Sequence, residues 1–165
     1  MKIIPFCILL FIGFGLQAQH SIDAVLKAFN ENSIPYISVS EARMLQLHNE
    51  ATVLDAREWY EFEISAIPSA KYIGYQSFSP EKILQYVTDK TSPIIVYCSV
   101  GIRSEDIALE IKKLGYTNVK NLYGGIFEWK NKGFPVIDLQ GNTTEKVHTF
   151  SKAWEKYLEK GIKIN

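Results

Sequence analysis

The chain has 165 residues, of which 47% are hydrophobic and 22% charged, values typical of a globular domain and not of a disordered or collagen-like chain. Eighteen basic residues balance eighteen acidic ones, so we expect no broad charged field that would attract nucleic acid or an anionic membrane. Nine Tyr, nine Phe and three Trp are enough to fill the core of one domain. Any anion binding must therefore come from a local site.

Residues 1–18 have the pattern of a secretory signal peptide. Lys2 gives a positive start, residues 3–16 are almost wholly apolar, and Ala18 is a small residue at the expected cleavage point. The apolar run is shorter than the roughly 18 residues that a membrane span requires, and Pro5 interrupts it. The sequence thus predicts an exported protein, periplasmic or secreted, with no stable membrane insertion after cleavage.

Cleavage would remove Cys7 and leave Cys98 as the single cysteine of the mature chain. Cys7 lies too early, inside the apolar run, to serve as a lipoprotein cysteine. A lone cysteine in an oxidising compartment is either buried and inert or kept for its reactivity. The residues around Cys98 must decide between these two interpretations.

The first predicted element is an N-terminal helical segment, residues 19–35. Apolar residues recur at helical spacing over 21–30, with a serine at the start as a suitable cap. Residues 36–39 then predict a short strand, and Ser40 is expected to cap the helix that follows. A strand and a helix therefore open the main domain.

Strands and helices alternate through this main domain, whose predicted bounds are 36–137. The continuous apolar run 93–97 is typical of a strand buried on both faces of a parallel sheet, so we expect it at the centre. The alternation predicts an α/β fold with three layers, in which helices cover both faces of a mainly parallel sheet. The other expected elements are strands over 52–55, 70–73 and 119–122, and helices over 80–87, 104–114 and 124–129.

Residues 138–165 are expected to form a C-terminal helical extension. Its large apolar residues fall on one face of a helix that would start near residue 143. Such a face predicts a helix that docks on the domain, and a helix that binds a partner or a second copy is the alternative. The residues of this face are Val147, Phe150, Trp154, Tyr157 and Leu158.

Cys98 follows the predicted central strand, at the sheet edge where α/β proteins bind ligands. Gly101 permits backbone conformations that let successive N–H groups point inward, and the helix that begins at Ser104 adds a partial positive charge. This field, together with Arg103, favours a thiolate over a thiol. The sequence therefore predicts a nucleophile, Cys98, in an anion-binding loop made of Ser99, Val100, Gly101, Ile102, Arg103 and Ser104.

This loop resembles that of the rhodanese family, whose single-domain members carry Cys-x-x-Gly-x-Arg-Ser between a central strand and a helix. Other segments of the chain are similar to the family's recurring sequences, in the same order, so the resemblance covers roughly residues 37–137. It implies that 36–137 form a rhodanese-like domain. The similar segments are 54–58, 61–62, 67–70, 114–116, 122–125 with Trp129, and 133–136.

One turn departs from the family pattern. The family usually has Gly-His-Ile-Pro-Gly-Ala, and here Ser65, Ala66 and Ser69 stand at the first Gly, the His and the second Gly. The histidine more often packs in this fold than takes part in catalysis. Its replacement therefore does not count against activity.

The resemblance implies a sulfurtransferase with ping-pong chemistry. The Cys98 thiolate takes a sulfane sulfur from a small donor such as thiosulfate, becomes a persulfide, and passes the sulfur to a thiophilic acceptor, which is a thiol, cyanide or a carrier protein. The negative terminal sulfur needs converging N–H donors, which the loop provides. No cofactor is implied.

Three other polar residues have structural alternatives. Arg103 either binds an anionic donor or pairs with a nearby carboxylate, and its guanidinium suits both roles equally. Asp55 and Arg57 follow a strand end and are expected to support the site as a structural ion pair. No metal site is predicted, because metal-ligand spacing is absent among the three histidines, His20, His48 and His148.

Two other functions compete with sulfur transfer. Cysteine phosphatases and arsenate reductases place five residues between Cys and Arg, which leaves room for a tetrahedral oxyanion. Four residues separate Cys98 from Arg103, and this shorter loop suits a single sulfur atom. A non-catalytic rhodanese-like binding or regulatory module is the nearer alternative, although such modules often lack the cysteine that is present here.

Overall fold

The structure is a computed structural model that describes residues 21–165. The predicted signal peptide, residues 1–18, and Cys7 lie outside the described residues. Within 21–165, no helix is both long and apolar enough to cross a membrane.

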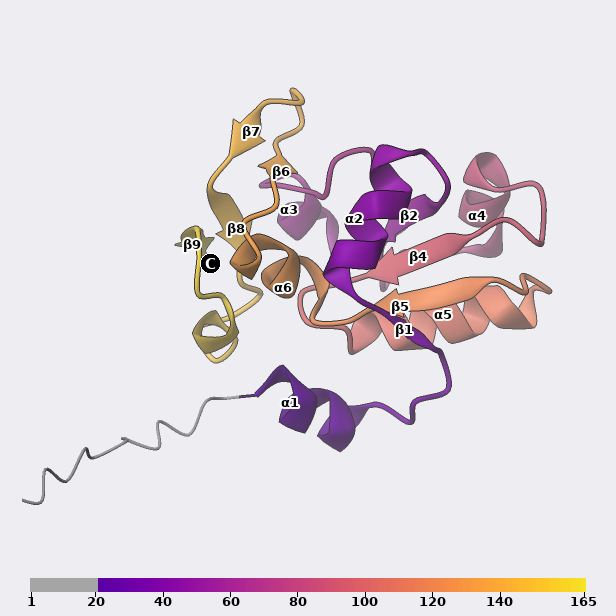
Figure 1. Cartoon of the computed structure of the whole chain (residues 1–165), viewed down its shortest axis with the longest axis horizontal. Coiled ribbons are helices and arrows are strands. Elements are labelled where there is room, and N and C mark those ends of the chain that lie inside the picture. The colour runs from indigo at the N-terminus through magenta and orange to yellow at the C-terminus, as the bar shows by residue number, and fades with distance from the viewer. Residues whose placement is uncertain (1–20) are drawn as a thin grey trace, which may run out of the picture.

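Five parallel strands form the central sheet in the order β1-β5-β4-β2-β3 (Figure 1). The strand β4 lies in the middle, as predicted, because it pairs with β2 on one side and with β5 on the other. All four of its residues are buried, which explains its unbroken apolar sequence. The strands are β1 (Tyr36–Ile37), β2 (Thr52–Asp55), β3 (Lys71–Tyr72), β4 (Ile94–Tyr97) and β5 (Val119–Leu122).

Helices cover both faces of this sheet, so the predicted three-layer α/β fold is confirmed. Alternate residues of β4 face opposite layers: Ile95 and Tyr97 belong to one apolar cluster, and Ile94 and Val96 belong to the other. The first cluster includes α2 (Val39–Leu47) and α6 (Gly125–Asn131), and the second includes α4 (Pro80–Tyr86) and α5 (Arg103–Lys113). The short helix α3 (Trp59–Phe62) follows β2.

The N-terminal helix α1 (Ile22–Phe29) forms as expected, with the Ser21 hydroxyl accepting from the Ala24 N–H. The predicted cap of α2 was wrong by two residues. Ser38, in extended conformation, accepts from the Glu41 N–H at 3.2 Å, so the helix already begins at Val39. A serine at position 40 lies inside the helix and cannot cap it.

The predicted helix over the C-terminal extension was wrong. This part of the chain contributes three strands to two strand pairs and forms one short 3₁₀ turn, because β-branched residues dominate where the strands lie and Phe150 has a left-handed backbone that no α-helix accommodates. The elements are β6 (Val136–Ile137) with β7 (Thr143–Thr144), β8 (Lys146–His148) with β9 (Ile162–Ile164), and η1 (Glu155–Tyr157).

The extension nevertheless packs on the domain, as its apolar residues suggested. Val147 and Leu158 are buried in the same cluster as α2 and α6. In Figure 1 these last strands stack beside α6, near the end of the sheet that carries the loop after β4.

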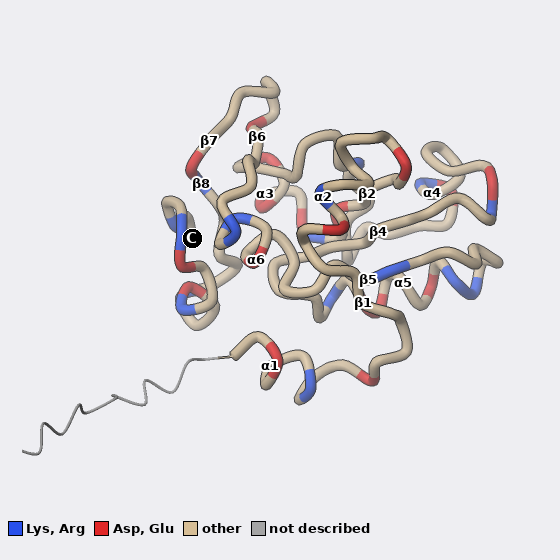
Figure 2. Tube along the Cα trace, viewed as in Figure 1, with Lys and Arg blue, Asp and Glu red and all other residues tan. Residues whose placement is uncertain are grey.

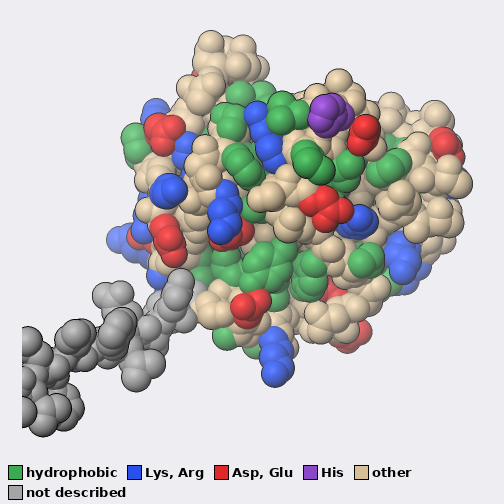
Figure 3. All heavy atoms as spheres, viewed as in Figure 1, with side chains coloured by type: hydrophobic (Ala, Val, Ile, Leu, Met, Phe, Trp, Pro, Cys, Tyr) green, Lys and Arg blue, Asp and Glu red, His purple; other side chains and the backbone are tan. Residues whose placement is uncertain are grey.

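Charges of both signs are scattered along the chain (Figure 2). The visible face in Figure 3 likewise mixes charged and apolar side chains, with no area held by one sign. This arrangement agrees with the balanced composition, so any anion binding must come from a local site.

Candidate active site

Cys98 lies directly after β4 and immediately before the turn into α5, at the carboxyl edge of the sheet. Its residue is only 1% exposed, yet its sulfur accepts a hydrogen bond from the Gly101 N–H at 3.1 Å, and the Ser104 hydroxyl, whose proton goes to Asn121, lies 3.5 Å from it. The positive end of α5, an eleven-residue helix, faces the same loop. The N–H group and the helix end stabilise negative charge on the sulfur.

Two amide side chains hold Gly101 in place. Its backbone has a φ of 111°, a conformation that favours glycine, and its carbonyl accepts from Asn30 and from Asn121, each at 2.8 Å. Asn121 Oδ1 also accepts from the Ser104 hydroxyl at 2.7 Å. The sequence did not single out either asparagine, because each is distant in the chain: Asn30 follows α1 directly, and Asn121 belongs to β5.

The start of α6 supports the other side of the loop. The Ile126 and Phe127 N–H groups donate to the carbonyls of Cys98 and Ser99 at 2.9 and 3.1 Å. Gly125 makes this close approach possible, since a Cβ there would lie 2.3 Å from the Cys98 carbonyl oxygen. Gly125 is therefore a supporting residue of the site.

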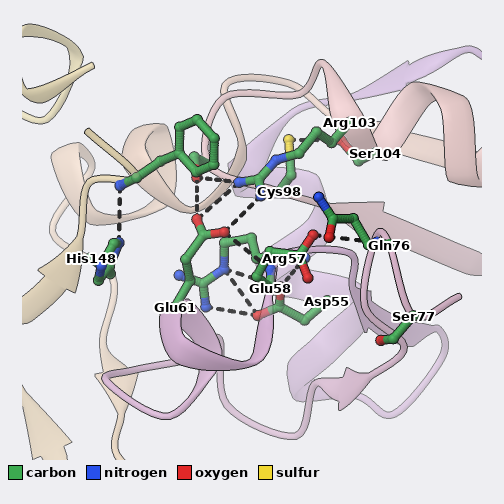
Figure 4. Close-up of polar contacts among 12 residues, drawn as sticks. Asp55, Arg57, Glu58, Glu61, Gln76, Ser77, Cys98, Arg103, Ser104 and His148 are labelled. Carbon is green, nitrogen blue, oxygen red and sulfur yellow. Dashed lines mark hydrogen bonds and ion pairs between the residues drawn. The ribbon is translucent and has the colours of Figure 1, made fainter. Parts of the chain in front are cut away.

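Arg103 forms a two-pronged ion pair with Glu61 of α3, at 2.6 and 2.9 Å (Figure 4). The Ser99 hydroxyl joins both partners, at 3.0 Å from each. Burial raises the pKa of Glu61, but the hydrogen bond and charge of Arg103, with the charge of Arg57, outweigh it and hold that pKa below its usual value. Of the two interpretations for Arg103, the structure shows the ion pair.

Asp55 and Arg57 form a second, completely buried pair, 2.7 Å apart. The Asp55 carboxylate also accepts from the Tyr97 hydroxyl and the Arg57 backbone N–H, and the guanidinium donates to the Ser65 carbonyl at 2.6 Å. These contacts join β2, β4 and the turn at Ser65. The arrangement matches the structural role expected for this pair.

A small pocket of about 150 Å³ opens at Cys98. Four loop residues besides the cysteine line it, and the C-terminal extension contributes two aromatic side chains that the sequence did not connect with the site. The lining residues are Cys98, Ser99, Val100, Ile102, Arg103, Phe150 and Trp154.

His148 lies beside this site (Figure 4). Its Nδ1 accepts from the Phe150 N–H at 3.0 Å, and its ring packs against Tyr60 with centroids 5.0 Å apart. Burial lowers its pKa, although the charge of Glu61 acts in the opposite sense. Over the described part of the chain, no cluster of three or more His, Cys, Asp or Glu could hold a metal ion.

The parallel sheet and the cysteine loop at its edge define an α/β protein with a cysteine pocket at the carboxyl ends of its strands. The family model for the rhodanese-like domain matches residues 38–132, and the chain belongs to this family. The match ends before the C-terminal extension, so the two aromatic residues of the pocket lie outside it.

Curated relatives of two kinds match this chain. The thiosulfate sulfurtransferase GlpE of Actinobacillus succinogenes is 34% identical over 98 residues, which are 59% of this chain and 85% of that protein. The tRNA uridine(34) hydroxylase of Erwinia tasmaniensis is 31% identical over 108 residues, 61% of this chain and 31% of the relative. The chain thus spans about a third of the length of the tRNA hydroxylases that it matches.

Solved structures show the same fold. The thiosulfate sulfurtransferase from Pseudomonas aeruginosa superposes with a TM-score of 0.61 at 23% identity, covering 72% of this chain and 22% of that one. The BH2092 protein from Bacillus halodurans superposes with a TM-score of 0.58 at 19% identity, covering 73% and 89%.

Proposed function

We propose that this protein is a sulfurtransferase that carries a sulfane sulfur as a persulfide on Cys98. The observation that carries the proposal is that Cys98 lines a pocket while its sulfur accepts from the Gly101 N–H beside the positive end of α5. A buried inert cysteine has no need of such a donor or of a pocket. The match to the thiosulfate sulfurtransferase of A. succinogenes over 85% of that protein supports the same reaction class.

The proposed reaction has two steps. The Cys98 thiolate attacks the outer sulfur of a donor, the donor's S–S bond breaks, and the leaving group departs with its electron pair; thiosulfate would leave as sulfite. An acceptor thiolate or cyanide then attacks the terminal sulfur of the persulfide and restores the Cys98 thiolate. The Gly101 N–H and the positive end of α5 stabilise the negative charge in both steps.

Intact-mass measurement of the purified chain tests this function. After incubation with thiosulfate or another sulfane donor, the wild type should gain the mass of one sulfur atom, and Cys98→Ser should gain none. Cyanide should then remove the sulfur as thiocyanate. If no donor marks Cys98, the sulfurtransferase proposal falls and the protein is a binding module; phosphate release from an aryl phosphate that depends on Cys98 would make it a phosphatase.

We also propose that the protein acts after export, in the periplasm or outside the cell. The support is the charged, then apolar, then small-residue pattern of residues 1–18. Sequencing the mature amino terminus from an exporting bacterial host should place the first residue near position 19. An intact Met1 would overturn this part of the proposal.

A further inference from the structure

The walls of the Cys98 pocket are mainly apolar. Val100 and Ile102 of the loop contribute one side, and Phe150 and Trp154 of the C-terminal extension contribute the other. Because the matched family range ends at residue 132, the aromatic side is a feature of this chain's own extension. The pocket volume is about 150 Å³, and an apolar cavity of roughly that size is large enough to hold a benzene ring.

Arg103 is the one charged residue among those that line this pocket, and its charge is already in use. Both of its terminal nitrogens donate to the Glu61 carboxylate, and its guanidinium lies over the Phe150 ring, 4.7 Å from the centroid. The Glu61 side chain is completely buried, so solvent does not weaken the pair. A doubly charged donor would therefore find no unpaired cation in the pocket.

The position of Phe150 is held against a conformational cost. Its φ is 65°, a region that bulky residues rarely adopt. Two hydrogen bonds fix the segment: the Phe150 N–H donates to His148, and the neighbouring Thr149 N–H donates to the Ile164 carbonyl at 2.8 Å. Strained backbone of this kind persists where the surrounding structure imposes it, and it gathers at ligand sites. Even so, Phe150 is 43% exposed, and it lines the pocket.

We infer that the sulfane donor of this protein is an organic one, whose leaving group carries an apolar substituent of about the size of one ring, and that Phe150 and Trp154 bind that substituent. This inference rests on the proposed function, because it names the substrate class for transfer to Cys98. It assigns to the extension the role of selecting an organic persulfide or thiosulfonate over inorganic thiosulfate.

The transfer from such a donor balances without a further reactant. For an organic thiosulfonate, the Cys98 thiolate forms a bond to the outer sulfur, the bond between the two sulfur atoms breaks, and the electron pair leaves on the sulfinate. For an organic persulfide, the leaving group is the thiolate of the organic part. In both cases, the apolar group is part of the leaving group, so it occupies the pocket until the sulfur has been transferred.

Three probes separate the apolar group from charge and reactivity. Benzenethiosulfonate and methanethiosulfonate carry the same single charge and the same reacting sulfur, and they differ in the ring; thiosulfate carries two charges and no organic group. Loading of Cys98 is followed by intact mass, and each rate is divided by that of the same probe with N-acetylcysteine in solution. We expect benzenethiosulfonate to load about tenfold faster than methanethiosulfonate, because the ring buries apolar surface, and thiosulfate to be the slowest.

Substitutions then test which residues recognise the ring. Phe150→Ala should lower the preference for benzenethiosulfonate about threefold or more, Trp154→Phe should lower it less, and Leu139→Ala, a change at an exposed site of the same extension, should not alter it. If Phe150→Ala fails to fold by circular dichroism, Phe150→Leu and Trp154→Phe carry the test. Equal normalised rates for the two thiosulfonates, a preference unchanged by all pocket variants, or faster loading by thiosulfate overturns the inference while the proposed function stands. Loading by none of the probes overturns both.

Discussion

Two arginine–carboxylate pairs lie near the short helix α3, and they differ in what surrounds them. The Asp55–Arg57 pair has no solvent exposure, and all its further partners are groups of the fold: the Tyr97 hydroxyl and the Ser65 carbonyl. The Glu61–Arg103 pair has one partner that is 16% exposed, and that partner lines the Cys98 pocket. The same kind of ion pair thus holds the sheet edge together in one place and neutralises the one charged residue that lines the Cys98 pocket in the other.

The largest effect is expected where the pair is completely buried. Asp55→Ala should lower the free energy of unfolding by about 3–5 kcal/mol, because the Arg57 charge stays buried without its carboxylate. Urea denaturation measures the change. Glu110→Ala is the control, since its pair with Lys113 is 51–60% exposed, and it should cost no more than about 1 kcal/mol. A loss in Asp55→Ala as small as that of the control would contradict the structural role.

A smaller loss of stability, with a change in specificity, is expected for the second pair. Glu61→Gln keeps the shape but removes the charge, so it should cost about 1–3 kcal/mol and leave the Arg103 cation available to an anionic donor. Loading of Cys98 by thiosulfate should then rise relative to methanethiosulfonate. The double variant Glu61→Gln with Arg103→Met should show no such rise. A folded Glu61→Gln protein with an unchanged ratio would mean that Arg103 does not control donor charge.

The contrast also shows what could be predicted from the sequence. Asp55 and Arg57 are two residues apart, after a recognisable strand, so their pairing follows from local sequence. Glu61 meets Arg103 only because α3 folds against a loop 42 residues further along the chain. The strand-loop-helix arrangement around Cys98 was predictable, because burial and glycine placement are local signals, but the partners that complete it were not.

The C-terminal extension shows the same limit. Its apolar residues occur at spacings that suit a helix, and the burial of Val147 and Leu158 was anticipated correctly. The pairing of β8 with β9 depends on residues about 16 positions apart, and helical periodicity contains no information about such a contact. The placement of Phe150 and Trp154 at the pocket follows from this strand pairing, so it could not be predicted either.

Acid should remove the contribution that the Glu61 carboxylate makes to stability. Because the folded protein holds the pKa of Glu61 below the ordinary 4.5, the carboxylate stabilises the fold above about pH 4.5, and this contribution is lost as the pH falls through the lowered value. The difference in unfolding free energy between wild type and Glu61→Gln should therefore be constant near neutral pH and shrink below pH 4.5. Urea melts from pH 3 to 7 measure it; a difference that grows in acid would contradict the assignment.

The smallest expected effect concerns His148, a residue of the extension that lies near the Glu61–Arg103 pair. Burial lowers its pKa from 6.5, so the unfolded chain takes up a proton first, and stability should fall as the pH drops below about 6.5. The protonated ring also cannot accept from the Phe150 N–H. His148→Asn keeps an acceptor but does not titrate, so it should flatten the dependence of the unfolding free energy on pH between pH 5 and 7. In the wild type, the slope of this dependence should stay under roughly 1.4 kcal/mol per pH unit, the value for uptake of one full proton. Identical slopes in the two proteins would show that His148 does not couple pH to the wall of the Cys98 pocket.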